Sequence, residues 1–145
     1  MGRYQAASEA RVAEIVRGAR VVAVVGMKGE RDRAAPAFYV PQAMKGHGIR
    51  LVPVNPMIDE ALGAPSLKSV SDLTEKVDVI QIFRRPELVP ALADEILALP
   101  AERRPPVVWL QTGIIHEAAA ETLTEAGIEV VMDRCFMVDA RRYRG

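Results

Sequence analysis

The chain has 145 residues, which suits one domain and is too short for two of typical size. Hydrophobic residues make up 50% and charged residues 26%, a balance that excludes intrinsic disorder. The 19 basic and 19 acidic residues cancel, which argues against a general nucleic-acid binder because such proteins carry excess positive charge.

The first half of the chain alternates helical patterns with short apolar runs. A helix is predicted over residues 8–18, where apolar residues recur at helical spacing and a glycine marks the end. Residues 21–25 form a β-branched run without polar alternation, typical of a strand buried on both faces. A second helix is predicted over residues 36–45, kinked or delayed by Pro41, and a second strand over residues 50–54.

The second half continues this alternation. Three more strands are predicted, over residues 77–83, 107–110 and 128–131. Helices are predicted over residues 86–99, opened by a proline, and over residues 116–126, ended by a glycine. In the least regular stretch we expect a short strand near residues 65–67 and a helical turn near residues 71–73.

Alternating strands and helices predict an α/β fold with a doubly wound, mostly parallel sheet of five or six strands and helices on both faces. Residues 1–145 form one predicted domain, with an N-terminal helix within residues 1–18 and a tail over residues 140–145. In such folds ligands bind beyond the carboxyl ends of the strands, where the strand order reverses. The candidate site segments are therefore residues 26–34, 55–57, 83–87 and 111–114.

The segment after the first strand, from Gly26 to Ala34, holds two glycines and the cations Lys28, Arg31 and Arg33. Glycine lets a backbone approach a ligand closely, and N–H groups at a helix N-terminus attract anions together with such cations. This chemistry favours a phosphate site, although the spacing matches neither the dinucleotide-binding fingerprint nor the Walker A loop. A solvated charged turn is the alternative.

Asn55 and Pro56 end the second predicted strand. Nicotinamide-binding folds usually place an acidic residue there to bind the ribose hydroxyls. Asn55 carries no charge, which argues against NAD, and an Asx turn made by its side chain is the alternative explanation.

Arg84 and Arg85 follow Phe83 at a predicted strand end and precede a predicted helix start. Cations at a helix N-terminus oppose the helix dipole, and a bound anion would relieve that conflict. Surface ion pairs, including one between Arg85 and Glu87, are the alternative.

The remaining polar candidates point to binding rather than catalysis. Gln111 and Thr112 end a predicted strand and can hydrogen-bond a polar ligand, although Thr112 could instead cap the next helix. His47 and His116 lie on different elements without metal-ligand spacing, so no metal site is expected. Cys135 is the only cysteine, which excludes an internal disulfide, and we expect a packed structural thiol rather than a nucleophile.

The N-terminal segment lacks the apolar core of a signal peptide. No run approaches the roughly 18 apolar residues of a membrane span. We therefore expect a cytoplasmic protein with no membrane or nucleic-acid partner, and the sequence leaves open whether it has a protein partner.

Five strand-end segments, taken together and in order, resemble the small stand-alone CoA-binding protein family. The segments are VVG at residues 24–26, VPVNP at 52–56, DVIQIFRRPE at 78–87, VWLQTG at 108–113 and AGIEVVMDRC at 126–135. That family in turn resembles the CoA-binding domain of the succinyl-CoA synthetase alpha subunit. The resemblance covers about residues 18 to 139, and five motifs in the same order make it specific.

The resemblance implies a Rossmann-like fold that binds coenzyme A or an acyl-CoA across the carboxyl edge of the sheet. It implies that the loop over residues 26–34 holds the phosphates, that residues 55–57 border the adenosine end, and that the two later loops line the pyrophosphate and pantetheine path. The candidate binding residues are Gly26, Met27, Lys28, Arg31, Arg33, Ala34, Asn55, Pro56, Phe83, Arg84, Arg85, Gln111 and Thr112. One departure is Lys28, which stands where the family often has a small hydroxyl residue.

The resemblance leaves two classes of function open. The favoured one is a CoA-binding module without catalysis, acting as a carrier, sensor or regulatory partner. The alternative is a nucleotide-dependent enzyme, either acyl-CoA-linked or an NAD(P)-dependent oxidoreductase. Ligase activity is not implied, because the phosphorylated histidine of the synthetase lies in a second domain that has no counterpart in this sequence.

Overall fold

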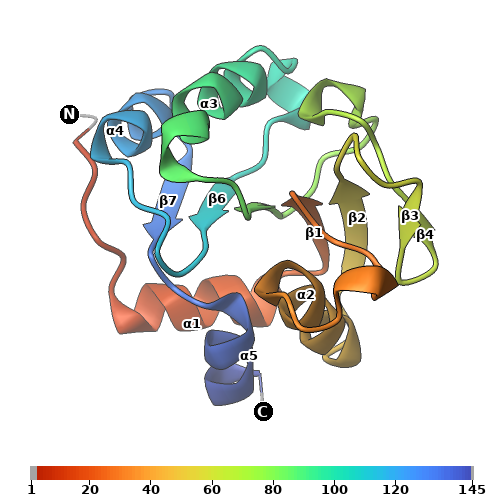
Figure 1. Ribbon diagram of the computed structural model, residues 1–145. Coiled ribbons are helices and arrows are strands. Elements are labelled where there is room, and N and C mark those ends of the chain that lie inside the picture. Colours follow the sequence, from red (N-terminus) through yellow and green to blue (C-terminus); the bar gives the residue numbers. More distant parts are fainter. Residues whose placement is uncertain (1–2, 145) are drawn as a thin grey trace.

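Five strands form one parallel sheet in the order β2-β1-β5-β6-β7. They are β1 (Val21–Val25), β2 (Arg50–Val54), β5 (Val79–Ile82), β6 (Val107–Leu110) and β7 (Glu129–Met132). Figure 1 shows the computed structural model, which describes residues 3–144, so residues 1, 2 and 145 of the predicted domain and tail lie outside it. Strand β1 pairs with β2 on one side and β5 on the other, so the strand order reverses at β1 and β5.

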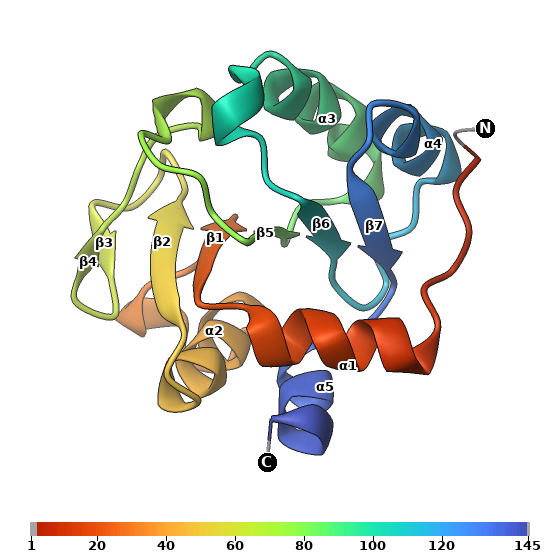
Figure 2. The same ribbon diagram turned by 180° about the vertical axis from the view of Figure 1, so that it is seen from behind.

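Helices cover both faces of this sheet, as the sequence predicts. On one face lie α1 (Glu9–Gly18), α2 (Pro36–Gly46) and α5 (Phe136–Tyr143), and on the other lie α3 (Val89–Leu97) and α4 (Glu117–Glu125) (Figures 1 and 2). The predicted α/β, doubly wound and Rossmann-like architecture is therefore confirmed.

The uninterrupted apolar runs are explained by this double cover. In β6, Val107 and Trp109 pack against the α1, α2 and α5 side, while Val108 and Leu110 pack against α3 and α4. All four are buried, because each face of the strand has helices above it. A strand with one solvated face would alternate apolar and polar residues instead.

The helix ends follow ordinary capping chemistry. Ser8 precedes α1, and its hydroxyl accepts a hydrogen bond from the Arg11 N–H at 3.1 Å. His116 precedes α4, and its Nδ1 accepts from the Ala119 N–H at 3.1 Å. The predicted helix over residues 86–99 is instead a 3₁₀ turn, Pro86–Leu88, followed by α3.

The connection between β2 and β5 carries a small ribbon of two antiparallel strands, β3 (Glu60–Ala61) and β4 (Ala64–Pro65). The short strand expected near residues 65–67 is thus β4, placed slightly earlier in the chain. Three further 3₁₀ turns lie in connections, at Glu30–Asp32, Val70–Asp72 and Ala101–Arg103. The second of these is the helical turn expected near residues 71–73.

The C-terminal segment differs most from expectation. Residues 140–145 are predicted to be a tail, whereas the chain is helical through Tyr143 as part of α5. This helix packs beside α1 and α2 and buries Phe136 and Ala140 (Figure 1). Among the described residues, no helix is long and apolar enough to cross a membrane.

Candidate functional site

The loops after β1 and β5 approach each other closely where the strand order reverses. Gly26 has φ +83°, and a Cβ at this position would lie 2.3 Å from the Phe83 carbonyl oxygen. The Phe83 N–H donates to the Val25 carbonyl at 2.8 Å, and the Gly26 N–H donates to the Val54 carbonyl at 2.8 Å. Only glycine fits this junction, because any side chain would strike the backbone of the neighbouring loop.

Asn55 holds the first loop from inside the protein. Its Nδ2 donates to the Met27 carbonyl at 2.8 Å, and its Oδ1 accepts from the Met57 N–H at 2.9 Å. The second bond is the Asx turn that the sequence allows, and the first joins the loop after β2 to the loop after β1. Asn55 and Met27 are both buried, so their side chains support the loop rather than face solvent.

A proline in α2 also helps to place the first loop. Pro41 lies inside the helix and has no N–H, so the carbonyl of Ala37 has no helical donor four residues later. The Lys28 N–H donates to that carbonyl at 3.0 Å. Pro41, which the sequence suggests as a kink or late start of this helix, therefore leaves an acceptor that anchors Lys28 against α2.

Beyond these loops a cleft of about 740 Å³ runs along the carboxyl edge of the sheet. This volume lies within the roughly 300–1,000 Å³ typical of small-molecule sites. Its wall combines the loops after β1, β5, β6 and β7 with the first half of α2 and the start of α5. Six of the predicted residues line it: Lys28, Phe83, Arg84, Arg85, Gln111 and Thr112.

The other predicted residues lie around the cleft rather than in its wall. Arg31 and Arg33 are exposed in and beside the 3₁₀ turn Glu30–Asp32, and the Arg33 guanidinium lies 6.0 Å from the Phe38 ring centre. Ala34 is also exposed. The structure thus separates the cations of the first loop: Lys28 lines the cleft, and Arg31 and Arg33 are not among its lining residues.

A smaller pocket of about 270 Å³ adjoins the cleft, and Arg84 lines both. Its wall includes Pro56, Lys68 and Leu88. Lys68 Nζ donates to the Ile58 carbonyl at 3.2 Å. Lys68 is not predicted as a site residue from the sequence, because it lies in the irregular stretch after β4 and follows no predicted strand end.

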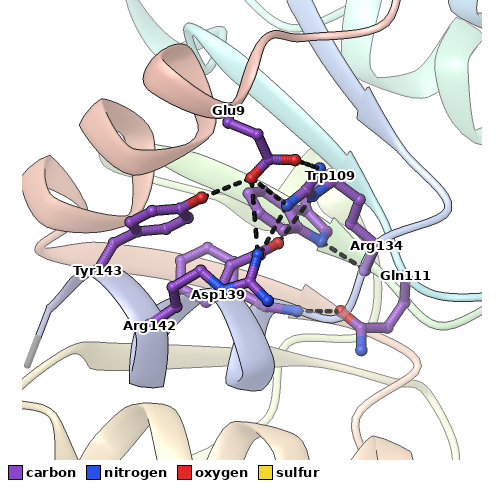
Figure 3. A network of polar contacts seen from close by, with 8 residues as sticks. Glu9, Trp109, Gln111, Arg134, Asp139, Arg142 and Tyr143 are labelled. Carbon is purple, nitrogen blue, oxygen red and sulfur yellow. Dashed lines mark hydrogen bonds and ion pairs between the residues drawn. The ribbon is translucent and has the colours of Figure 1, made fainter.

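Gln111 supplies a polar group to the middle of the cleft. The residue is buried, and its Oε1 accepts from Gln81 Nε2 and from the Phe136 N–H, both at 3.0 Å. Figure 3 shows Gln111 beside the start of α5. No hydrogen bond to another described residue is made by the Nε2 atom of Gln111. Its amide nitrogen is therefore the donor that Gln111 can offer to a ligand.

A network of charged residues holds the end of the cleft beyond β7 (Figure 3). The Arg134 guanidinium donates to Asp139 at 2.9 and 2.8 Å and to Glu9 of α1 at 2.8 Å. Hydrogen bonds from Arg134 and from the Tyr143 hydroxyl lower the pKa of Glu9 to about 2. Because Asp139 and Tyr143 belong to α5, this network fixes that helix against α1 and β7.

Cys135, the residue before α5, also lines the cleft. The thiol is half-buried, packs partly against the core and lines the cleft beside Met137 and Val138. The histidines lie elsewhere, with His116 capping α4 and His47 ending α2. Within residues 3–144, no group of three or more His, Cys, Asp or Glu side chains could hold a metal ion.

Comparison with known proteins gives consistent matches over most of the chain. The family model described as a CoA binding domain matches residues 20–141. An uncharacterized protein of Bacillus subtilis, YneT, is 38% identical over 131 residues, covering 90% of this chain and 93% of that protein.

Two solved structures of similar size extend this comparison. The structure titled cell-free ID.343 from Thermus thermophilus is 37% identical, with a TM-score of 0.86, and covers 94% of this chain and 99% of its own. A hypothetical protein from Pyrococcus horikoshii OT3 is 27% identical, with a TM-score of 0.85 and complete coverage of both chains.

Proposed function

This chain belongs to the CoA binding domain family, and from that premise we propose that its cleft binds coenzyme A or an acyl-CoA. The observation that carries the proposal is the meeting of Lys28, Arg84 and Arg85 in the wall of one cleft, at the reversal of strand order. The net charge of the chain is zero, so the phosphates of CoA need such a local group of cations.

The other predicted residues have defined parts in this proposal. Gly26, Met27 and Asn55 shape the phosphate loop from behind, through the close approach to Phe83 and the Asn55 hydrogen bond. The Gln111 amide nitrogen donates to the pantetheine arm, whose amide carbonyls are acceptors. The pocket beside Arg84, with Pro56 and Lys68, is the place for the adenosine end.

We propose binding without catalysis, as a carrier, sensor or regulatory module. The residues described as lining the cleft include no histidine, aspartate or glutamate that could act as a general base. NAD is the weaker candidate ligand. The Asn55 side chain is already hydrogen-bonded to the backbone of Met27 and Met57, and it carries no negative charge to bind the ribose hydroxyls.

The test is a thermal-shift panel of CoA, acetyl-CoA, NAD, NADP and ATP, followed by titration calorimetry. Ligand at 100 times its dissociation constant adds about 2.7 kcal/mol to the unfolding free energy, and we expect this effect from CoA and much less from NAD. Equal or stronger stabilisation by NAD would favour the oxidoreductase alternative.

Substitution separates a specific cleft from a charged surface. R84A and K28A should each weaken CoA binding about tenfold or more, because a hydrogen bond to a charged group contributes roughly 1.5–3 kcal/mol. They should also reduce the salt dependence of binding. K76A is the matched control, because Lys76 is exposed at the opposite, amino end of β5. Parent-like CoA binding by both R84A and K28A would refute the site.

A further inference from the structure

The wall of the cleft changes from charged to apolar along the edge of the sheet. The strand order places the loops in the sequence β1, β5, β6, β7. Lys28, Arg84 and Arg85 follow the first two strands, and the buried Gln111 follows the third. At the fourth strand the cleft wall consists of Cys135, Met137 and Val138. A second pocket of about 410 Å³ shares Cys135 and Val138 with the cleft, and its charged lining residues are Asp133, Arg134, Asp139 and Arg142.

Helix α5 lines the cleft after β7 with apolar side chains, and α2, which packs beside α5, adds further apolar side chains to the same cleft. Met137 and Val138 come from α5, and Tyr39 and Val40 come from α2, which lies on the same face of the sheet (Figure 1). Tyr39 is 40% exposed and Val138 is 47% exposed, so both offer apolar surface to the cleft. An exposed apolar surface beside a polar groove is typical of a ligand contact.

The length of CoA brings its sulfur to this end. Three strand spacings of about 4.8 Å separate β1 from β7, which is roughly 14 Å. The pantetheine arm has about a dozen bonds between phosphorus and sulfur, and at the reach of an extended peptide, about 3.5 Å per three bonds, it spans roughly 14 Å. A CoA with its pyrophosphate at Lys28 and Arg84 therefore presents its sulfur beside Cys135 and Met137.

We infer that the β7 end of the cleft receives the acyl chain of an apolar acyl-CoA, so that the protein prefers short- to medium-chain acyl-CoA over free CoA. This inference rests on the proposed function. A charged acyl group fits less well, because the nearby Arg134 guanidinium is already paired with Glu9 and Asp139. Arg142, in the pocket that shares Val138, also lies 3.9 Å from Glu9. Tyr39 and Val138 carry no positive charge that could pair with an acyl carboxylate.

The experiment measures dissociation constants for CoA and for acetyl-, butyryl-, hexanoyl- and succinyl-CoA by calorimetry. A methylene fully removed from water strengthens binding about fourfold, and a partly open cleft should give about twofold per methylene. Hexanoyl-CoA, which has four more methylenes, should thus bind about sixteenfold more tightly than acetyl-CoA. Butyryl-CoA should bind more tightly than succinyl-CoA, which has the same number of acyl carbons but a carboxylate in place of the terminal methyl.

Substitutions in the cleft wall test whether it causes the higher affinity for acyl-CoA. V138S and, independently, Y39S should each lower the ratio of hexanoyl-CoA affinity to CoA affinity at least about threefold, since each removes apolar contact area. I115S is the matched control, because Ile115 is 50% exposed but does not line the cleft, and it should leave the ratio unchanged.

The outcomes distinguish this inference from the proposed function. If CoA binds but the acyl series is flat, or succinyl-CoA equals butyryl-CoA, the acyl inference is refuted and CoA binding stands. If neither CoA nor any acyl-CoA binds, the proposed function itself fails. A chain-length effect that V138S, Y39S and I115S all leave unchanged would place the acyl group elsewhere and also refute the inference.

Discussion

The two ends of the cleft are built by different kinds of contact. At the β1 end, the loop is held by the buried Asn55 side chain, backbone hydrogen bonds and a glycine junction. At the β7 end, helix α5 is held by an ion-pair network in which Glu9 is exposed and Arg134 is half-buried. Neutral buried contacts do not respond to pH or salt, whereas exposed charge pairs do. Acid or high salt should therefore weaken the β7 end, whereas the β1 end should be weakened only by substitutions that disturb its buried contacts.

The largest expected effect is at the glycine junction. G26A should destabilise the protein by about 2–4 kcal/mol, because its Cβ would strike the Phe83 carbonyl and its φ of +83° is strained for alanine. Chemical denaturation measures the change. Gly113 is the control: its φ is +82° but nothing lies within 4 Å of a Cβ, so G113A should cost only the backbone strain of about 1–2 kcal/mol. Equal losses in the two variants would contradict the close approach.

The buried amide should give the next largest effect. N55D keeps the oxygen that accepts from the Met57 N–H but removes the donor to the Met27 carbonyl. N55D should lower the free energy of unfolding by about 1–3 kcal/mol, because the Met27 carbonyl loses its hydrogen bond and a carboxylate is placed beside it. Denaturation and CoA titration should both respond, because the loop carrying Lys28 loses its support. A variant with parent-like stability and binding would show that the backbone contacts alone hold this loop.

The β7 end should respond to acid, where the β1 end should not. Glu9 has its pKa lowered from 4.5 to about 2 in the folded protein. A lowered pKa contributes stability that is present above pH 4.5 and is lost as the pH falls towards 2. The melting temperature of E9Q should therefore fall less than that of the parent between pH 5 and pH 3, at roughly those values.

A control for the acid effect uses salt. High salt at pH 6 should weaken the exposed Glu9 pairs and reduce the difference between E9Q and the parent protein. Identical pH profiles for the two proteins would mean that the network does not contribute measurably to stability.

The smallest effect concerns the thiol. Cys135 is half-buried at the cleft wall, and no histidine is among the described lining residues. We predict slow alkylation of the native protein near neutral pH, compared with the same protein unfolded in denaturant. Rapid native alkylation that CoA suppresses would contradict the prediction that Cys135 is not a nucleophile.

Local patterns were sufficient to predict the sheet. The apolar runs at residues 21–25 and 107–110 predict strands that lie between two layers of helices, and both are observed with those bounds. The sequence does not predict helix α5, because its eight residues are too few to show a helical period and two arginines stand in its last turn. Its stability comes from packing on α1 and from the Arg134 network, and neither is visible in a local pattern.

The α/β class, the strand-end segments that could carry a site and the family to which they belong can all be predicted from the sequence, because burial on both faces and glycine-rich turns leave local signatures. Only the tertiary structure decided which cations share a cleft. Lys28 and Arg31 are three residues apart, yet a hydrogen bond to Ala37 turns the first toward the cleft, while the second lies in an exposed 3₁₀ turn. Side-chain direction in a loop depends on such non-local backbone contacts, and spacing along the chain does not encode them.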